Sequence, residues 1–263
     1  MDYSIEQFAQ STFSIDSNGT IFTATDLDRE REPSYTFRVT VTDGAEASEA
    51  LSATCMVQVT LDDVNDQSPT FDPIGDLSVP ENAPSNTPIA TLKARDGDEG
   101  RNAEVKYYLE DSISMKFGIG RIDGVLRTLA PLDREEVDTY DLLVTAVDSG
   151  SPALSSQRKV RVKVADENDN APKFSQRRYR AKAHESAAVG EKVLETNAVD
   201  LDEGRNAKLR FSIISGDLDQ DFKIDELTGA LSVAKRLDYE RKNQYELTLQ
   251  VRKILPCLYQ DLL

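Results

Sequence analysis

Acidic residues recur along this chain in short motifs at a nearly constant spacing, and these motifs are where chemistry could occur. The segment Asp96–Ala103 (DGDEGRNA) returns 104 positions later as Asp200–Ala207 (DLDEGRNA). The tripeptide Asp28–Glu30 (DRE) returns 105 positions later as Asp133–Glu135. Carboxylates that lie close together repel one another unless a cation or a proton joins them. Because the donors are hard oxygens, calcium fits them better than zinc or copper.

Zinc sites, EF-hands and disulfide frameworks do not fit the sequence. One histidine and two cysteines that lie 202 positions apart cannot supply a zinc quartet or a set of disulfides. An EF-hand loop ends on a glutamate at its twelfth position. The loop that starts at Asp96 has Tyr107 there, and the loop that starts at Asp200 has Phe211. The motifs therefore predict a calcium site of another kind.

The charge of the chain excludes several classes of partner. Its 263 residues include 31 Lys and Arg against 47 Asp and Glu, which gives a formal net charge of −16. This surplus repels the phosphates of DNA, RNA and anionic membranes, so no nucleic acid partner is expected. No apolar run approaches the ~20 residues of a membrane-spanning helix, and the first residues lack the pattern of a signal peptide.

Alternating side chains predict the elements that position these motifs. Apolar and polar residues alternate over 37–41, 55–61, 140–146, 160–164 and 245–251. Such alternation is typical of strands that bury one face. Polar turn clusters separate the strands, and no long helical pattern occurs. We therefore predict an all-β fold of tandem Greek-key β-sandwiches, with seven strands in each complete repeat.

The motif spacing divides the chain into three repeats and a tail. Residues 1–66 form a partial repeat that lacks its first strands, and residues 67–170 form a complete repeat. Residues 171–251 form a repeat truncated at its C-terminal end, and residues 252–263 leave the pattern. The chain is therefore expected to be a fragment.

Both end repeats are expected to be looser than the middle repeat. A β-sandwich closes its core only when both sheets are present. The first repeat lacks its opening strands, so Phe13, Phe37 and Val39 are predicted to be poorly covered. In the tail, Pro256 lacks an amide donor and cannot rebuild the last strand of the third repeat.

The ordered set of motifs resembles the cadherin superfamily. The resemblance covers residues 1–251 and rests on Pro80–Asn82, Asp96 with Asp98, Leu132–Glu135, Ala146–Gly150 and Asp166–Pro172, in the family's order. It implies extracellular rods of tandem sandwiches with three calcium ions at each junction. Protocadherin-like or Fat-like members fit better than strand-swapping ones, because this chain has no tryptophan to insert into a partner.

The resemblance implies one ligand set between the first and second repeats, which we call cluster 1. Its members are Asp28, Glu30, Asn65, Asp66, the carbonyls of Val64 and Gln67, Asp96, Asp98, the Asn102 carbonyl and Asp148. The family has asparagine where this chain has Gln67, but the ligand there is the backbone oxygen. A glutamate that a full first repeat would add is missing with its N-terminal strands.

A second set, cluster 2, is implied between the second and third repeats. Its members are Glu81, Asp133, Glu135, the carbonyls of Glu167 and Asn170, Asn168, Asp169, Asp200, Asp202 and the Asn206 carbonyl. The position that matches Asp148 is Lys253. A lysine repels a cation, so the distal ion of this junction is expected to bind weakest.

The function implied by the resemblance is calcium-dependent cell–cell adhesion, in which calcium stiffens the rod. No catalytic residues are predicted, and the chain is not expected to be an enzyme. Other cadherin ectodomains are the expected partners, on the extracellular face of the plasma membrane and within a membrane-anchored parent protein. A non-adhesive spacer and a carboxylate-based hydrolase remain as alternatives. Asn18–Thr20 forms an N-glycosylation acceptor, consistent with a glycoprotein.

Overall fold

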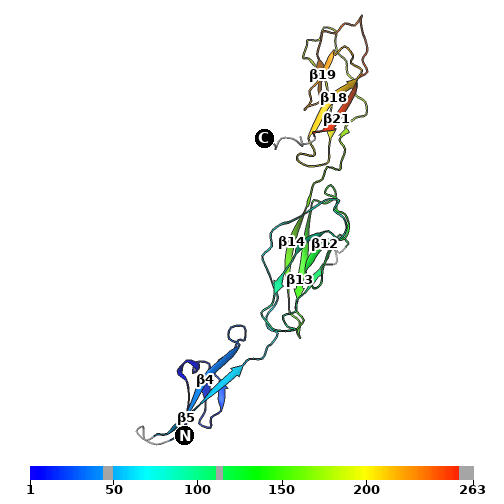
Figure 1. Ribbon diagram of the computed structural model, residues 1–263. Coiled ribbons are helices and arrows are strands. Elements are labelled where there is room, and N and C mark those ends of the chain that lie inside the picture. The colour runs from blue at the N-terminus through cyan, green and yellow to red at the C-terminus, as the bar shows by residue number, and fades with distance from the viewer. Residues whose placement is uncertain (44–49, 111–114, 255–263) are drawn as a thin grey trace, which may run out of the picture. The chain divides into compact units, whose positions relative to one another are not determined.

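The chain folds into strands, turns and one short 3-10 helix (Figure 1). The computed structural model describes residues 1–43, 50–110 and 115–254. Two compact units compose it: residues 1–75, 90–127 and 142–160 form unit 1, and residues 76–89, 128–141 and 161 onward form unit 2. Every residue of cluster 1 belongs to unit 1 and every residue of cluster 2 belongs to unit 2.

The first repeat is built around one antiparallel sheet. Its elements are β1 (Asp2–Ile5), the 3-10 helix η1 (Gln7–Ala9), β2 (Phe13–Ile15), β3 (Ile21–Thr23), β4 (Ser34–Thr42) and β5 (Ser52–Thr60). The sheet has the order β1-β4-β5, and β2 pairs with β3 in a separate hairpin. Apolar residues on alternate positions of β4 turn one of its faces toward the core, as the sequence predicts. Cys55 lies in β5 and is exposed, whereas Cys257 lies outside the described residues.

The expectation of a poorly covered core in the first repeat is wrong. Phe13, Phe37 and Val39 are all buried, together with Ile5 and Ala9. The cover comes from β1 and η1. The rings of Phe13 and Phe37 stack with their centroids 4.8 Å apart, so the shortened repeat still closes a small aromatic core.

The middle repeat contains β14, the longest strand of the described residues. Its elements are β6 (Thr70–Phe71), β7 (Leu77–Pro80), β8 (Pro88–Thr91), β9 (Ala94–Arg95), β10 (Lys106–Leu109), β11 (Phe117–Ile119), β12 (Val125–Thr128), β13 (Thr139–Val147) and β14 (Ser155–Ala165). One sheet has the order β10-β13-β14-β7, a second has the order β11-β12-β8, and β6 pairs with β9. The pairing of β7 with β14 is parallel. Leu142, Val144 and Ala146 on β13 are buried, as are Val162 and Val164 on β14.

The third repeat repeats this plan with shorter ladders. Its elements are β15 (Lys173–Phe174), β16 (Lys192–Glu195), β17 (Ala198–Val199), β18 (Leu209–Ser215), β19 (Phe222–Ile224), β20 (Ala230–Val233) and β21 (Thr248–Lys253). The sheets have the orders β16-β20-β19, β18-β21 and β15-β17. Its core gathers Ala187, Phe222, Leu231, Val233 and Leu237.

The strand predicted over 245–251 begins later and extends further than expected. β21 starts at Thr248, because the pairing with β18 shifts register between Ile213 and Ser215. Gly216 follows with φ of +92°, and a side chain there would meet the backbone oxygen of Glu246 at 1.9 Å. At its other end β21 runs through Lys253, which the sequence analysis assigned to the tail.

Candidate metal centres

Two turns and two loops position the side chains of cluster 1. Asp28 caps the turn that carries Glu30, because its Oδ1 accepts a hydrogen bond from the backbone N–H of Arg31 at 3.0 Å. In the loop after β9, the Oδ1 of Asp96 accepts a hydrogen bond from the N–H of Asp98 at 3.0 Å. Such Asp-based turns are local, so the sequence itself sets the direction of these carboxylates.

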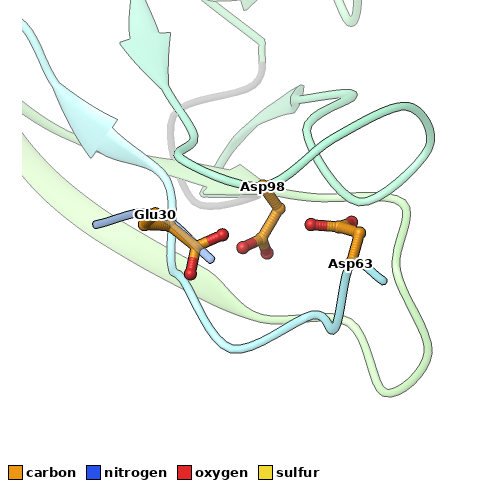
Figure 2. Close-up of side chains that lie close together, drawn as sticks. All are labelled: Glu30, Asp63 and Asp98. Atoms are coloured by element: carbon orange, nitrogen blue, oxygen red, sulfur yellow. The ribbon is translucent and has the colours of Figure 1, made fainter. Parts of the chain in front are cut away.

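The carboxylates of Glu30, Asp63 and Asp98 point toward one another (Figure 2). One oxygen from each lies within 4.8 Å of the others. Glu30 comes from the first repeat, Asp63 from the linker and Asp98 from the second repeat. Three anionic groups from three segments therefore converge on one point, which is an arrangement that a hard cation stabilises.

Several buried oxygens of cluster 1 lack a partner. Among the described residues, no hydrogen-bond donor reaches Asp96 Oδ2, Asp98 Oδ1 or Asn65 Oδ1, although all three atoms are buried. Burial raises the pKa of Asp98, and repulsion from Asp96 raises it further, against the lowering effect of the hydrogen bond from Gln67. Unpaired buried oxygens are costly, so this set fits a cation bound by oxygen ligands.

Hydrogen bonds from its own loop and from the linker hold the carboxylate of Asp148 in cluster 1. Its Oδ1 accepts hydrogen bonds from the N–H groups of Gly150 at 3.0 Å and Leu154 at 3.1 Å. The side-chain amide of Asn65 donates to Asp148 Oδ2 at 3.2 Å and to the carbonyl of Pro152 at 2.6 Å. This second bond turns the amide nitrogen of Asn65 toward the loop, so its side-chain oxygen remains available to bind a cation.

An arginine inside each junction neutralises part of the negative charge. The guanidinium of Arg29 lies 2.6 Å from both Glu30 and Asp63. Arg134 contacts Glu135 and lies 2.8 Å from Asp166. Burial alone lowers the pKa of each arginine, but the neighbouring carboxylates outweigh it and the pKa of both lies above its usual value.

The sequence analysis missed Asp63 and Asp166, which open the two linker motifs. The side-chain amide of Asn102 donates to Asp63 Oδ2 at 2.8 Å, and that of Asn206 donates to Asp166 Oδ2 at the same distance. These matched bonds tie each linker to the loop of the following repeat. The signal was available, because both aspartates precede an Asn-Asp pair at the repeat spacing.

Cluster 2 is organised by a glutamate that has no counterpart in cluster 1. Glu81 is 0% exposed, and it accepts hydrogen bonds from the N–H groups of Arg134 at 3.0 Å and Glu167 at 2.6 Å. Oxygens of Glu81, Glu135 and Asp169 lie within 4.8 Å of one another. The second and third of these come from the turn after Leu132 and from the linker, as the resemblance predicts.

The loop of the third repeat copies that of the second. The N–H of Asp202 donates to Asp200 Oδ1 at 3.0 Å, as Asp98 donates to Asp96. The N–H of Asn170 donates to Asp202 Oδ1 at 3.1 Å, as the N–H of Gln67 donates to Asp98 at 3.3 Å. Glutamine in place of asparagine therefore leaves this linker contact unchanged.

Lys253 points into cluster 2. Its ammonium group forms an ion pair with Asp202, lies 3.3 Å from Asp200 Oδ1 and donates to Asn168 Oδ1 at 2.5 Å. Burial raises the pKa of Asp202, but the hydrogen bonds from Lys253 and Asn170 outweigh it, so this pKa lies below its usual value. The pKa of the matched residue, Asp98, lies above its usual value instead, because no ammonium group contacts it in the described part of the chain.

Further hydrogen bonds hold Asp66, Asp169 and Asp133 in place. Asp66 Oδ1 accepts a hydrogen bond from the Gln67 side chain at 2.9 Å, and Asp169 Oδ1 accepts one from the Asn170 side chain at 2.8 Å. Asp133 Oδ1 caps its turn by accepting the N–H of Glu136 at 3.2 Å.

Comparison with known proteins identifies the family of this chain. The model of the cadherin domain matches residues 1–62, 76–165 and 179–254. The chain belongs to the cadherin family. Its fold is that of tandem cadherin β-sandwiches, since the solved structure of protocadherin gammaB7 EC3-6 in a cis dimer superposes with a TM-score of 0.82 at 28% identity. That superposition covers 96% of this chain and 63% of the protocadherin.

The curated relatives are much longer cadherins. Human protocadherin Fat 4 is 41% identical over 239 residues, which is 90% of this chain and 5% of the relative. The protocadherin-like wing polarity protein stan of Drosophila melanogaster is 39% identical over 267 residues, which is 94% of this chain and 7% of the relative. This cadherin chain therefore spans a small part of these relatives. Among its described residues, no helix is long and apolar enough to cross a membrane.

Proposed function

We propose that clusters 1 and 2 bind calcium and that the bound ions fix the linkers between cadherin repeats in an adhesive extracellular segment. The observation that carries the proposal is the set of buried, unpartnered oxygens on Asn65, Asp96 and Asp98. Oxygens buried without a donor are rare in folded proteins, and a divalent cation supplies what they lack.

The proposed ligands of cluster 1 come from both sides of the first linker. Asp96, Asp98 and Asp148 supply carboxylates from the second repeat, while Asn65 supplies its side-chain oxygen from the linker. Glu30 and Asp66 add charge from the first repeat and the linker. All ligands are oxygens, and the cysteine and histidine donors that zinc prefers lie elsewhere in the sequence.

The proposed ligands of cluster 2 form a Glu81 end and a distal end. Glu81, Glu135 and Asp169 form the first of these, where the buried Glu81 already accepts hydrogen bonds from two backbone N–H groups. Asp200, Asp202 and Asn168 form the distal end. Asp133 and the backbone oxygens of Glu167, Asn170 and Asn206 stay proposed ligands on the strength of the resemblance.

Calcium binding would act on the linkers through charge. Bound calcium supplies positive charge between carboxylates that otherwise repel one another across the linker. Because the ligands come from two repeats and the linker between them, one ion removes the freedom of all three segments. Extracellular calcium modules bind with Kd of roughly 10⁻⁴–10⁻³ M, and we expect a similar range here.

The adhesive part of the proposal rests on the relatives, which are cadherin-repeat proteins. We propose that the partners are other cadherin ectodomains, outside the cell, and that the parent protein is membrane-anchored. A rigid spacer without an adhesive face uses the same calcium sites. Aggregation of beads coated with the chain, with calcium and with chelator, separates the two roles: calcium-dependent aggregation supports adhesion, and its absence supports the spacer.

Calcium titration of variants tests the proposed sites. Asp98 lies in one group of carboxylates with Glu30 and the linker residue Asp63, whereas Asp148 is bonded to Asn65 and to the backbone of its own loop. Asp98→Ala should therefore weaken calcium binding more than Asp148→Ala in isothermal titration. Equal losses in the two variants would contradict the proposed arrangement, and an unchanged titration in both would show that calcium does not bind at cluster 1.

A further inference from the structure

We infer that the ammonium group of Lys253 occupies the distal cation position of cluster 2, so that this junction takes up one calcium ion fewer than its motifs predict. The inference rests on the proposed calcium function of the two clusters. It concerns a disagreement between this chain and its family, because the ligand motifs of cluster 2 are intact while the residue that should complete them is a cation.

The contacts of Lys253 are those expected of a ligated cation. Its Nζ lies within reach of three oxygens: an oxygen of Asp202, Asp200 Oδ1 at 3.3 Å and Asn168 Oδ1 at 2.5 Å. One of these oxygens comes from the linker and two come from the loop of the third repeat. An ammonium group has three N–H donors, so three acceptors use its whole capacity.

The matched atoms of cluster 1 show what the lysine replaces. Asn65 corresponds to Asn168 and Asp98 to Asp202, and in each of them one buried oxygen lacks a donor among the residues described. In cluster 2 Asn168 and Asp202 both accept hydrogen bonds from Lys253, while Asp200 keeps one buried oxygen without a donor, as its counterpart Asp96 does. The asparagine and the second aspartate of the motif are therefore open to a cation in one junction and paired with a side chain in the other.

Lys253 is held in this position by the strand that carries it. β21 pairs Lys253 with Leu209, and the N–H of the next residue, Ile254, donates to the carbonyl of Lys208 at 2.8 Å. The side chains of Asp200 and Asp202 are 1% and 0% exposed, and that of Lys253 is 12% exposed. A lysine buried this far with two carboxylates is costly to remove from its partners.

Lys253, at the position that matches Asp148, changes how the second junction responds to calcium. A calcium ion at the distal position would have to displace Lys253 and would then lie beside its positive charge. Without calcium, Lys253 still joins the linker residue Asn168 to the third repeat. The distal end of cluster 2 therefore already holds a cationic side chain. In cluster 1 the linker residue Asn65 is bonded to Asp148 and Pro152, but buried oxygens of Asn65, Asp96 and Asp98 lack a donor among the described residues.

Counting bound ions tests this inference. Native mass spectrometry of the full chain in calcium measures the number of ions bound to the wild type, Lys253→Asp and Lys253→Ala. The matched control is Lys223→Asp, which makes the same charge change on β19 at an exposed position. Lys253→Asp should bind one ion more than the wild type, and the control should bind the same number as the wild type.

Thermal unfolding in chelator and in calcium provides a second test, which also applies if a variant is destabilised. Lys253→Ala and Lys253→Asp should both have a lower Tm than the wild type in chelator and a larger rise in Tm on adding calcium. Equal ion counts and equal calcium-induced rises in the wild type and both variants would overturn the inference while leaving the proposed function intact. Failure of the wild type to bind any calcium would instead overturn the proposed function.

Discussion

The two acidic clusters share their motifs, yet they balance their negative charge in different ways. Each has an arginine beside the Asp-Glu turn, an Asp-x-Asp loop and an asparagine amide that holds the linker aspartate. Cluster 2 adds the buried Glu81 and, at its distal end, Lys253. Cluster 1 has Asp148 in place of that lysine. Among the described residues, buried oxygens of Asn65, Asp96 and Asp98 lack a donor in cluster 1, whereas in cluster 2 this holds for Asp200 Oδ2.

This difference shows that a ligand motif does not by itself decide whether a cation site is open. The loops that supply Asp98 and Asp202 are locally alike, including their hydrogen bonds to the linker. What separates them is one position at the end of a distant strand, where Asp148 or Lys253 completes the site. The residue on the distant strand, Asp148 or Lys253, sets the net charge of the cluster, while the motif sets only the direction of the carboxylates.

The largest expected effect concerns Asp98 and its counterpart. Asp98→Ala should weaken calcium binding at cluster 1 by about tenfold or more, which corresponds to about 1.4 kcal/mol. Asp202→Ala should cost less, because an oxygen of Asp202 is already paired with Lys253. Isothermal titration of both variants measures the contrast. Equal losses would show that the two clusters bind calcium alike, and a greater loss for Asp202→Ala would reverse the expected contrast.

Cleavage of the linkers should also distinguish the two junctions. In chelator, the linker 63–69 should be cut faster by a nonspecific protease than the linker 166–172, because Glu81 and Lys253 anchor the second linker without calcium. Calcium should slow cleavage at both. Mass spectrometry of the early fragments gives the two rates, and faster cutting at 166–172 in chelator would contradict the account.

Glu81 should contribute to stability without calcium. Glu81→Gln leaves the N–H of Arg134 or that of Glu167 with a weaker acceptor, at a cost of about 1–3 kcal/mol in the free energy of unfolding. Chemical denaturation in chelator measures this cost. Glu99→Gln, at an exposed glutamate of cluster 1's loop, serves as the control and should change stability little.

The smallest expected effect lies away from the junctions, in two matched tyrosines. Burial, with a hydrogen bond to Asp221, raises the pKa of Tyr245 to about 12. The unfolded value is about 10, so this stabilisation is present below pH ~10 and is lost as the pH rises toward 12. The phenol absorbance of Tyr245→Phe should lack this late step, whereas that of Tyr140→Phe should retain it.

Much of the candidate site could be predicted from the sequence, because most of its residues lie in short motifs that carry the resemblance. The resemblance implied that Glu30 and Asp98 share one site and that Glu81, Glu135 and Asp169 share another, and the structure brings these side chains together. The alternation of apolar residues likewise predicted β4, β5, β13 and β14. These features depend on neighbours in the chain, which a sequence pattern records directly.

The features that sequence reasoning missed depend on distant partners. Lys253 was expected at the junction as a repelling charge, but its bonds to Asn168 and Asp202 require β21 to continue past Val251. Burial of Phe13 and Phe37 depends on β1 and η1, whose few residues carry no clear periodic pattern. Asp63 and Asp166 are held by the side chains of asparagines that lie 39 and 40 residues further along the chain.

Hydrogen exchange at the two linkers tests the central claim most directly. The amide protons of Gln67 and Asn170 donate to Asp98 and Asp202, so their exchange reports the closure of each junction. We expect calcium to slow exchange at both amides, with the larger change at Gln67, because Lys253 already orders the second junction. Exchange at both amides that is the same in calcium and in chelator would contradict it.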